Sequence, residues 1–331
     1  MGKAICVTGA GGFIASWIVR DLLNKGFSVH GTVRDPDDNA KCGHLKQLDG
    51  SKRLKLHKAD VLDYDSIADA IRDCEVVFHT ACPVTASTEN PEDVLVPAIT
   101  GTRNVLQACA QERVKRVIVT SSAAAVMFDP NRPAKKIVDE SCWSDSDYCT
   151  KLKQWYLLAK TESEKLAWSL SKEYGLDLIT ICPSYVFGPM LQPTLNLSSA
   201  VLKALVDGLS TVIPPFRDSS IPVVDVRDVS KAHILAMDKE EASGRYLCVE
   251  TVVSNSEIIK ILRAKFPQLP YPKENSRCVA ETSVWNQSGI RPDNLGREKL
   301  LGLITEFDIP LERMLLDAVS DMLNKGLLRA I

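Results

Sequence analysis

Hydrophobic positions along the chain fall into short apolar runs that alternate with amphipathic segments. The apolar runs lie at residues 3–8, 27–33, 54–60, 74–81, 114–122 and 176–183. Helical periodicity fills intervals between them at 13–26, 64–72, 91–112 and 151–173. Strands that alternate with helices in this order predict an α/β protein. Its sheet should be Rossmann-like, parallel and doubly wound, with helices on both faces.

The regular alternation fades after Pro183. Residues 184–196 have the composition of a loop, and we expect helices at 197–208, 227–237, 255–265 and 310–325, with a strand at 221–226. No internal repeat or low-complexity linker separates these elements from the sheet. We therefore expect a Rossmann domain at 1–183 and a smaller, interleaved C-terminal substrate lobe at 184–331. The helix at 227–237 and its neighbouring strand should return to the first domain.

Charge and cysteine content narrow the range of partners. The 40 Lys and Arg nearly balance the 42 Asp and Glu, and the net charge of −2 gives no reason to expect a nucleic acid or an anionic membrane. No apolar run reaches the roughly 18 residues of a membrane span, and the chain opens directly into a motif without a signal peptide. The ten cysteines form no CxxC pair and have no histidine at metal-ligand spacing. We expect a cytoplasmic protein with reduced thiols and no metal, either a monomer or a weak dimer.

Three glycines stand between the first predicted strand and the first predicted helix, in the stretch VTGAGGFIASW at 7–17. Gly9, Gly12 and Ala15 give the spacing G-x-x-G-x-x-A. Glycines at such a turn let the backbone approach a pyrophosphate, and the helix N-terminus offers unpaired N–H groups to it. We expect a dinucleotide to bind here. The residues that we expect to contact it are Gly9, Gly11, Gly12, Phe13 and Ile14, and the alternative is a structural turn without a ligand.

The end of the second predicted strand indicates which dinucleotide is used. It reads TVRDP, so Arg34 stands where NAD-binding folds place an acid for the ribose 2′-OH. A guanidinium suits a 2′-phosphate, and Lys41 could add charge. We therefore expect NADPH/NADP+. The other positions expected along the cofactor, at the ends of later strands, are Asp60, Val61, Thr80, Ala81, Thr120 and Pro183.

A serine, a tyrosine and a lysine form the predicted catalytic set. Ser122 ends a predicted central strand, and Tyr156 and Lys160 are one turn apart on the helix that follows. A reductase must protonate the oxygen of its substrate, and a lysine ammonium can lower the high pKa of a tyrosine. We assign Tyr156 as the acid, Lys160 as its tuner and Ser122 as a hydrogen-bond donor to the substrate. His79 and His233 stay open as other acids, although packing roles are favoured for both. A serine hydrolase is not supported, because the chain has no G-x-S-x-G.

These motifs, in this order, resemble the extended short-chain dehydrogenase/reductases. The segments DPNRP (129–133), VDESCWSDSDYC (138–149), KQWYLLAKTESEKLAW (153–168) and SGRYLCVE (243–250) resemble the plant cinnamoyl-CoA reductase and dihydroflavonol reductase group. The resemblance implies an NADPH-dependent carbonyl reduction in phenylpropanoid metabolism, the route to lignin and flavonoids. It implies the triad Ser122, Tyr156 and Lys160. It also implies cofactor contacts at Gly9, Gly12, Arg34, Lys41, Asp60 and Pro183.

The chain departs from this pattern at positions that face the substrate. The CoA-facing histidine and lysine of the group correspond to Val201 and Ala204, and a further arginine corresponds to Asn255. Met127 stands where dihydroflavonol reductases have a substrate-binding asparagine. We expect Met127, Trp155 and Val186 to line the substrate site. Reduction of a hydroxycinnamoyl-CoA thioester and reduction of an aldehyde or ketone both stay open. A nucleotide-sugar epimerase is the alternative from a different class.

Overall fold

A large parallel sheet forms the centre of the molecule. The structure, a computed structural model, describes residues 4–82, 90–133, 135–207, 220–272 and 291–329. Seven parallel strands have the order β3-β2-β1-β4-β5-β6-β9. Their bounds are Ala4–Thr8 (β1), Val29–Val33 (β2), Leu54–Lys58 (β3), Cys74–His79 (β4), Arg116–Thr120 (β5), Leu178–Pro183 (β6) and Gly244–Cys248 (β9). The central strands are rich in Val and Ile and almost completely buried, as expected for a sheet covered on both faces. The predicted fold class is confirmed.

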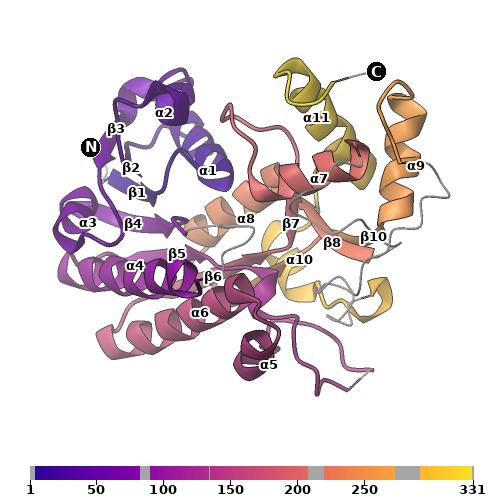
Figure 1. Cartoon of the computed structure of the whole chain (residues 1–331). Coiled ribbons are helices and arrows are strands. Elements are labelled where there is room, and N and C mark those ends of the chain that lie inside the picture. The colour runs from indigo at the N-terminus through magenta and orange to yellow at the C-terminus, as the bar shows by residue number, and fades with distance from the viewer. Residues whose placement is uncertain (1–3, 83–89, 134, 208–219, 273–290, 330–331) are drawn as a thin grey trace.

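Helices cover both faces of this sheet (Figure 1). One layer contains α3 (Tyr64–Ile71), α4 (Glu92–Gln111) and α6 (Trp155–Tyr174), which enclose one apolar core against the sheet. The other layer contains α1 (Phe13–Asn24) and α8 (Val226–Asp238), with α2 (Asn39–Lys46) beside them. The strand–helix alternation of the sequence therefore corresponds to two helical layers around one sheet.

A second, three-stranded sheet forms the smaller part of the molecule, on the right in Figure 1. It contains β7 (Tyr185–Phe187), β8 (Ser220–Asp225) and β10 (Thr251–Ser254), and it lies near α7 (Leu197–Asp207), α9 (Asn255–Lys265) and α11 (Leu311–Asn324). The expectation of a loop over 184–196 is wrong at β7, a strand too short to produce a pattern in the sequence.

The chain after β8 crosses back to the large sheet. Helix α8 packs against α1, β9 pairs with β6, and α10 (Glu298–Ile304) contacts both α8 and β9. The two parts are thus interleaved along the chain, and the ends of β6 and β9 connect them.

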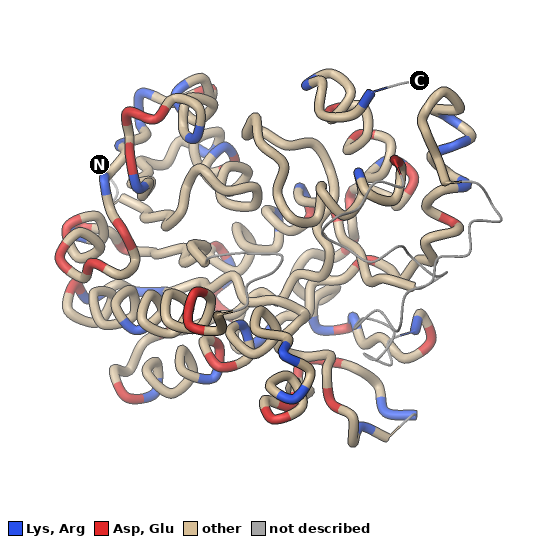
Figure 2. The backbone as a smooth tube through the Cα atoms, in the orientation of Figure 1, with Lys and Arg blue, Asp and Glu red and all other residues tan. Residues whose placement is uncertain are grey.

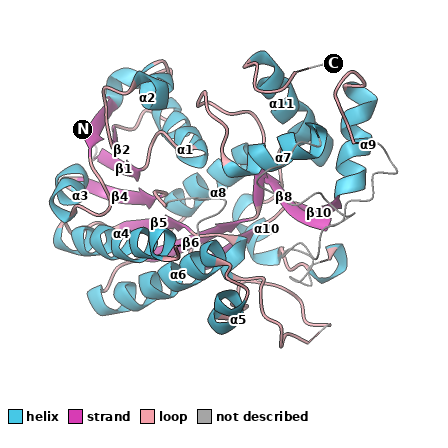
Figure 3. Cartoon of the chain, in the orientation of Figure 1, coloured by secondary structure: helices cyan, strands magenta, loops and turns pink. Residues whose placement is uncertain are grey.

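The helix expected at 151–173 is in fact two helices (Figure 3). A short helix, α5 (Ser146–Lys151), ends before a turn in which Lys153 has a φ of 53°. Helix α6 then begins at Trp155. A non-glycine residue in the left-handed region breaks the helix. Tyr156 therefore lies in the first turn of α6, not inside a longer helix.

Lys and Arg residues are interspersed with Asp and Glu residues along the described backbone (Figure 2). This distribution agrees with the near balance of charge in the composition. Across the described ranges, none of the helices combines the length and apolarity needed to cross a bilayer.

Candidate active site

The hydroxyl of Thr8 joins the carboxyl ends of β1 and β4. Its oxygen accepts hydrogen bonds from the backbone N–H groups of Thr80 and Ala81, both at 3.1 Å. It is also 3.0 Å from Nδ1 of His79. Because burial lowers the pKa of His79 to about 3, this imidazole is neutral and the threonine hydroxyl donates to it. This arrangement fixes the strand end at which Thr80 and Ala81 were expected to line a cofactor.

The glycine loop packs closely against its surroundings. Gly9 has a φ of 66°, and a Cβ there would lie 3.0 Å from the Cα of Ala81. A Cβ on Gly11 would lie 2.8 Å from the carbonyl oxygen of Lys41. Helix α1 begins after Gly12 with no side-chain cap and no acid in its first turn. These features fit a pyrophosphate, because the helix N-terminus keeps its N–H groups and its positive dipole for a ligand. Phe13 is buried and Ile14 is half-buried at the start of this helix.

The residues expected near the adenosine half follow β2 and β3. Arg34 is exposed directly after β2, and the Lys41 ammonium is 3.4 Å from Asp38. Asp60 is half-buried, and its Oδ1 accepts a hydrogen bond from the backbone of Leu62 at 2.9 Å. The side chain of Val61 packs so closely on α4 that a Cβ on Gly101 would lie 2.9 Å from it. The carboxyl ends of parallel strands thus gather these residues along one edge of the sheet.

Ser122, Tyr156 and Lys160 meet at the carboxyl end of β5. The Ser122 hydroxyl accepts the backbone N–H of Ala124 at 3.1 Å, and it is near enough to the Tyr156 phenol to lower its pKa. The buried Lys160 ammonium donates to the carbonyl of Thr120 at 2.9 Å. The triad predicted from the sequence is therefore assembled in space, with Thr120 holding the lysine.

The two titrating groups of the triad have pKa values above their ordinary ones. Burial raises the pKa of Tyr156. Lys160 and Ser122 both lower this pKa, but by less than burial raises it. Burial disfavours the ammonium of Lys160, yet the nearby acidic groups of Cys82, Tyr156 and Glu164 outweigh burial and raise its pKa. Lys160 therefore acts on the tyrosine pKa in the expected direction, although burial outweighs it. The further lowering that we expect from the positive charge of the nicotinamide stays a prediction. At neutral pH the phenol keeps its proton and the lysine keeps its charge.

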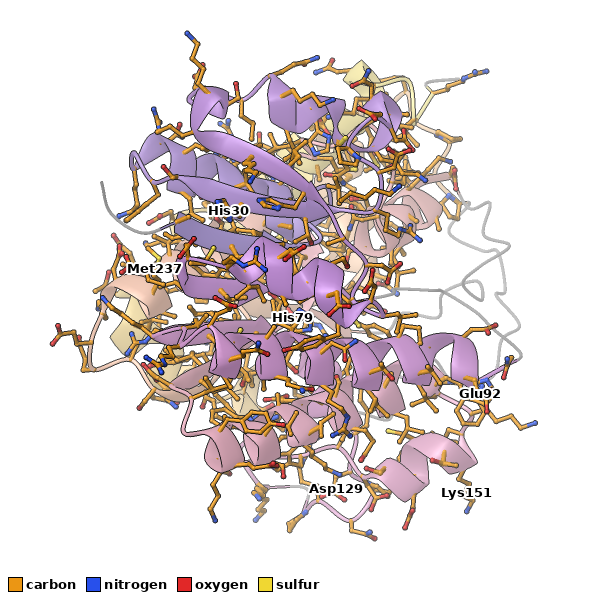
Figure 4. All side chains as sticks on the ribbon, turned by 90° about the vertical axis from the view of Figure 1, so that its left-hand side faces the viewer. His30, His79, Glu92, Asp129, Lys151 and Met237 are labelled. Atoms are coloured by element: carbon orange, nitrogen blue, oxygen red, sulfur yellow. The ribbon has the colours of Figure 1, made fainter. Side chains whose placement is uncertain are left out.

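His79 and His233 have structural partners. His79, labelled in Figure 4, is buried at the end of β4, and its Nδ1 is bonded to Thr8. The Nδ1–H of His233 donates to the carbonyl of Val229 at 2.8 Å, so its Nε2 accepts the hydroxyl of Thr120 at 2.8 Å. Burial lowers the pKa of His233 to about 4. Both imidazoles are neutral supports behind the strand ends.

The residues expected to line the substrate site differ in exposure. Trp155 is half-buried and directly precedes Tyr156. Val186 is buried in β7, and Pro183 is buried at the end of β6. Met127 is completely buried in an apolar cluster with Val126 and Phe128. Met127 thus belongs to the core directly beneath the site.

An ion pair below the triad was missed by the sequence reasoning. The carboxylate of Glu164 is completely buried, and Nε of Arg245 donates to it at 2.8 Å. One signal could have indicated Glu164, because it follows Lys160 by four residues and must share its helix face. The arginine is 81 residues further along the chain, and no local pattern connects the two.

The cysteines lie mostly in the interior. The structure describes nine of them, and eight are buried. Among the residues that the structure describes, no group of three or more His, Cys, Asp or Glu side chains could hold a metal ion.

Comparison with known proteins agrees with this geometry. Residues 5–248 match the model of the NAD dependent epimerase/dehydratase family. The chain is 46% identical over 327 residues to cinnamoyl-CoA reductase 1 of Petunia hybrida, covering 98% of this chain and 93% of that protein. Vestitone reductase from alfalfa has a similar structure, with a TM-score of 0.79 and 32% identity over 98% of this chain and 100% of that one. Yeast methylglyoxal/isovaleraldehyde reductase, solved with NADPH, has a TM-score of 0.81 and 27% identity, covering 98% and 99% of the two chains. These three similar proteins are reductases, and the chain itself belongs to the NAD dependent epimerase/dehydratase family.

Proposed function

We propose that this protein is an NADPH-dependent reductase that converts a hydroxycinnamoyl-CoA thioester to the aldehyde, with Ser122, Tyr156 and Lys160 as its catalytic residues. The observation that carries the proposal is the assembled triad at the end of β5, next to a glycine loop that fits a pyrophosphate. The identity of 46% to a cinnamoyl-CoA reductase over 98% of the chain supports the substrate class.

Two regions of the chain would bind different parts of the cofactor. Gly9, Gly11 and Gly12 would hold the pyrophosphate at the start of α1, and Arg34 with Lys41 would hold the 2′-phosphate. Bound NADPH supplies the hydride that the carbonyl carbon of the substrate receives. Arg34 supports this choice of cofactor, because a guanidinium stabilises a phosphate and an acid in its place would repel it.

Tyr156 would act as the general acid. Its phenol is protonated at neutral pH, because burial keeps its pKa above the ordinary value. It can donate that proton to the substrate oxygen, while Ser122 orients the phenol and the substrate. Lys160 stabilises the phenolate that is left, and the carbonyl of Thr120 holds the ammonium in place. With a thioester, this step gives a hemithioacetal, in which the hydroxyl oxygen and the sulfur are bonded to the same carbon. The C–S bond then breaks, so that the aldehyde forms and the CoA thiol is released.

Turnover with feruloyl-CoA and p-coumaroyl-CoA tests this proposal. We expect NADPH oxidation to release one equivalent of CoA thiol, which a thiol reagent detects. Tyr156→Phe should reduce kcat by about 100-fold or more, since general acid catalysis contributes at least that factor. Tyr174→Phe, at the exposed C-terminal end of α6, is the matched control and should keep wild-type turnover. Equal turnover by both variants would refute the role of Tyr156.

The positions expected to contact CoA favour a second candidate, an aldehyde or ketone reductase. Val201 is buried on α7, and Lys203 on the same helix is paired with Asp207. Asn255 is buried at the start of α9. None of these three described side chains offers a free cation to a CoA phosphate. Oxidation of NADPH by dihydroquercetin or an aldehyde, with no turnover of either CoA thioester, would select this candidate.

A further inference from the structure

Glu164 is a buried carboxylate with several hydrogen-bond donors. Its Oε2 accepts the hydroxyl of Ser121 at 2.6 Å, and its Oε1 accepts the hydroxyl of Thr180 at 2.7 Å. Nε and Nη2 of Arg245 donate to the two oxygens at 2.8 and 3.2 Å. One side chain on α6 therefore joins the residue after β5 to β6 and β9.

The first route from Glu164 to the triad is along β5. Ser121 directly precedes Ser122, and Thr120 directly precedes Ser121. The carbonyl of Thr120 accepts a hydrogen bond from the Lys160 ammonium, and the side chain of Ser122 lies beside the Tyr156 phenol and lowers its pKa. The bond from Ser121 to Glu164 thus fixes a residue whose two neighbours both hold a catalytic group.

The second route passes through Arg245 and the loop before α5. Nη1 of Arg245 donates to the carbonyls of Glu140 and Cys142 at 2.9 and 2.6 Å, and its guanidinium stacks on Trp143 at 3.7 Å. The next residue of that loop, Ser144, donates its hydroxyl to the carbonyl of Ala124 at 2.7 Å. This hydrogen bond therefore connects the loop to the turn that follows Ser122.

Charge connects Glu164 directly to Lys160. The two residues are one helical turn apart and line one small cavity of about 10 Å³, at the lower limit of the volume that holds a single water. Solvent screens buried charges in such a space only weakly. The other titratable or charged groups around Lys160 are Tyr156 on α6, His79 and Cys82 at the end of β4, Cys182 on β6, and Arg245 on β9. Thiols and phenols are neutral near pH 7, so the carboxylate is the negative charge that opposes the ammonium there.

We propose that Glu164 is a positioning residue for the carbonyl reduction: it fixes the strand end that carries Ser122, and its charge stabilises the Lys160 ammonium. This inference rests on the proposed function. Its consequence is that Glu164 contributes to kcat without contacting substrate or cofactor.

The variant Glu164→Gln tests the electrostatic part of the proposal, because it removes the negative charge and keeps the size of the side chain. We expect kcat to fall about tenfold or more, and the alkaline limb of its pH profile to move about one unit lower, because the ammonium loses its counter-charge. The KM for NADPH should stay within about twofold of wild type. Glu162→Gln makes the same chemical change on the outer face of α6, where Glu162 pairs with Lys165, and should match wild type. An alkaline limb that stays in place in Glu164→Gln would overturn the electrostatic part of the proposal.

Positioning is tested with Ser121→Ala against Thr180→Val. Each variant removes one hydroxyl that donates to Glu164, but only Ser121 adjoins Ser122. We expect Ser121→Ala to lower kcat about tenfold and Thr180→Val to leave it within about twofold. Equal effects of the two variants would overturn the positional part, and this pair decides the matter even if Glu164→Gln does not fold. Failure of the proposed function is distinguishable, because wild type itself would then show no Tyr156-dependent turnover.

Discussion

Asp228 makes the stability of the protein depend on pH in a predictable direction. Its carboxylate is completely buried on α8 and accepts the backbone N–H groups of Asp308 and Ile309 at 2.9 and 3.3 Å. Burial, together with the nearby charge of Asp225, raises the pKa of Asp228 from 3.8 to about 6 despite these hydrogen bonds. The folded protein therefore binds this proton more tightly than the unfolded chain does.

The size of the effect follows from the two pKa values of Asp228. Between them the native state carries more protons, so the free energy of unfolding decreases as the pH rises. The full shift corresponds to about 3 kcal/mol, and the part expressed between pH 5 and pH 7 is about 1.3 kcal/mol. Above pH 7 Asp228 no longer changes the free energy of unfolding, because it is ionised in both the folded and the unfolded state.

Urea unfolding at pH 5 and pH 7 measures this term. Asp228→Asn cannot titrate, so its loss of stability between the two pH values should be about 1.3 kcal/mol smaller than that of wild type. Glu250, whose pKa is raised to about 7 by burial and next by the charge of Asp228, titrates in both proteins. Its pKa is less raised in Asp228→Asn, so its part of the slope also becomes smaller there and acts in the same direction as the loss of Asp228. Asp238→Asn, on the outer surface of the same helix, is the control and should retain the wild-type slope. An unchanged slope in Asp228→Asn would show that the buried carboxylate has an ordinary pKa.

Three further predictions concern the cofactor region. Arg34→Ala should raise the KM for NADPH about ten- to 100-fold and leave that for NADH nearly unchanged, since one charge-assisted contact to the 2′-phosphate is lost; equal loss for both would contradict the assignment. Gly11→Ala should weaken NADPH binding in a fluorescence titration, because its Cβ would lie 2.8 Å from the Lys41 carbonyl, whereas Gly302→Ala in α10 has open space and should bind normally. Thr8→Val removes the acceptor of two backbone N–H groups and should lower the free energy of unfolding by about 2 kcal/mol in urea, and unchanged stability would show that water replaces the hydroxyl.

The large sheet was predictable because its strands alternate with amphipathic helices. The runs at 3–8, 74–81 and 114–122 became β1, β4 and β5 with shorter ends. Pattern alone could not reveal β7, which has three residues, or the break before α6, where Lys153 adopts a positive φ without a glycine to indicate it. Such features depend on tertiary contacts, and local propensity does not encode them.

The triad was predictable for a different reason. Tyr156 and Lys160 are local to one helix, and Ser122 ends a strand whose neighbours could be recognised. The groups that support the triad are not local in sequence. The hydroxyl of Thr120 is bonded to His233, and Glu164 is paired with Arg245, and both partners come from distant parts of the chain. Composition could not predict the net rise in the pKa of Tyr156 either, because burial sets it.

The segments that resemble cinnamoyl-CoA reductases support the backbone behind Ser122. In DPNRP, Arg132 donates to the carbonyls of Met127 and Val126 at 2.8 and 2.7 Å. In the loop before α5, Ser144 binds the turn after Ser122, and in SGRYLCVE, Arg245 binds that loop and Glu164. These contacts support the backbone of the triad whichever carbonyl is reduced, so the segments do not distinguish a thioester from an aldehyde. That distinction depends on positions such as Val201 and Asn255, which we expect to correspond to the CoA contacts of cinnamoyl-CoA reductases. The thiol-release assay is therefore the decisive measurement.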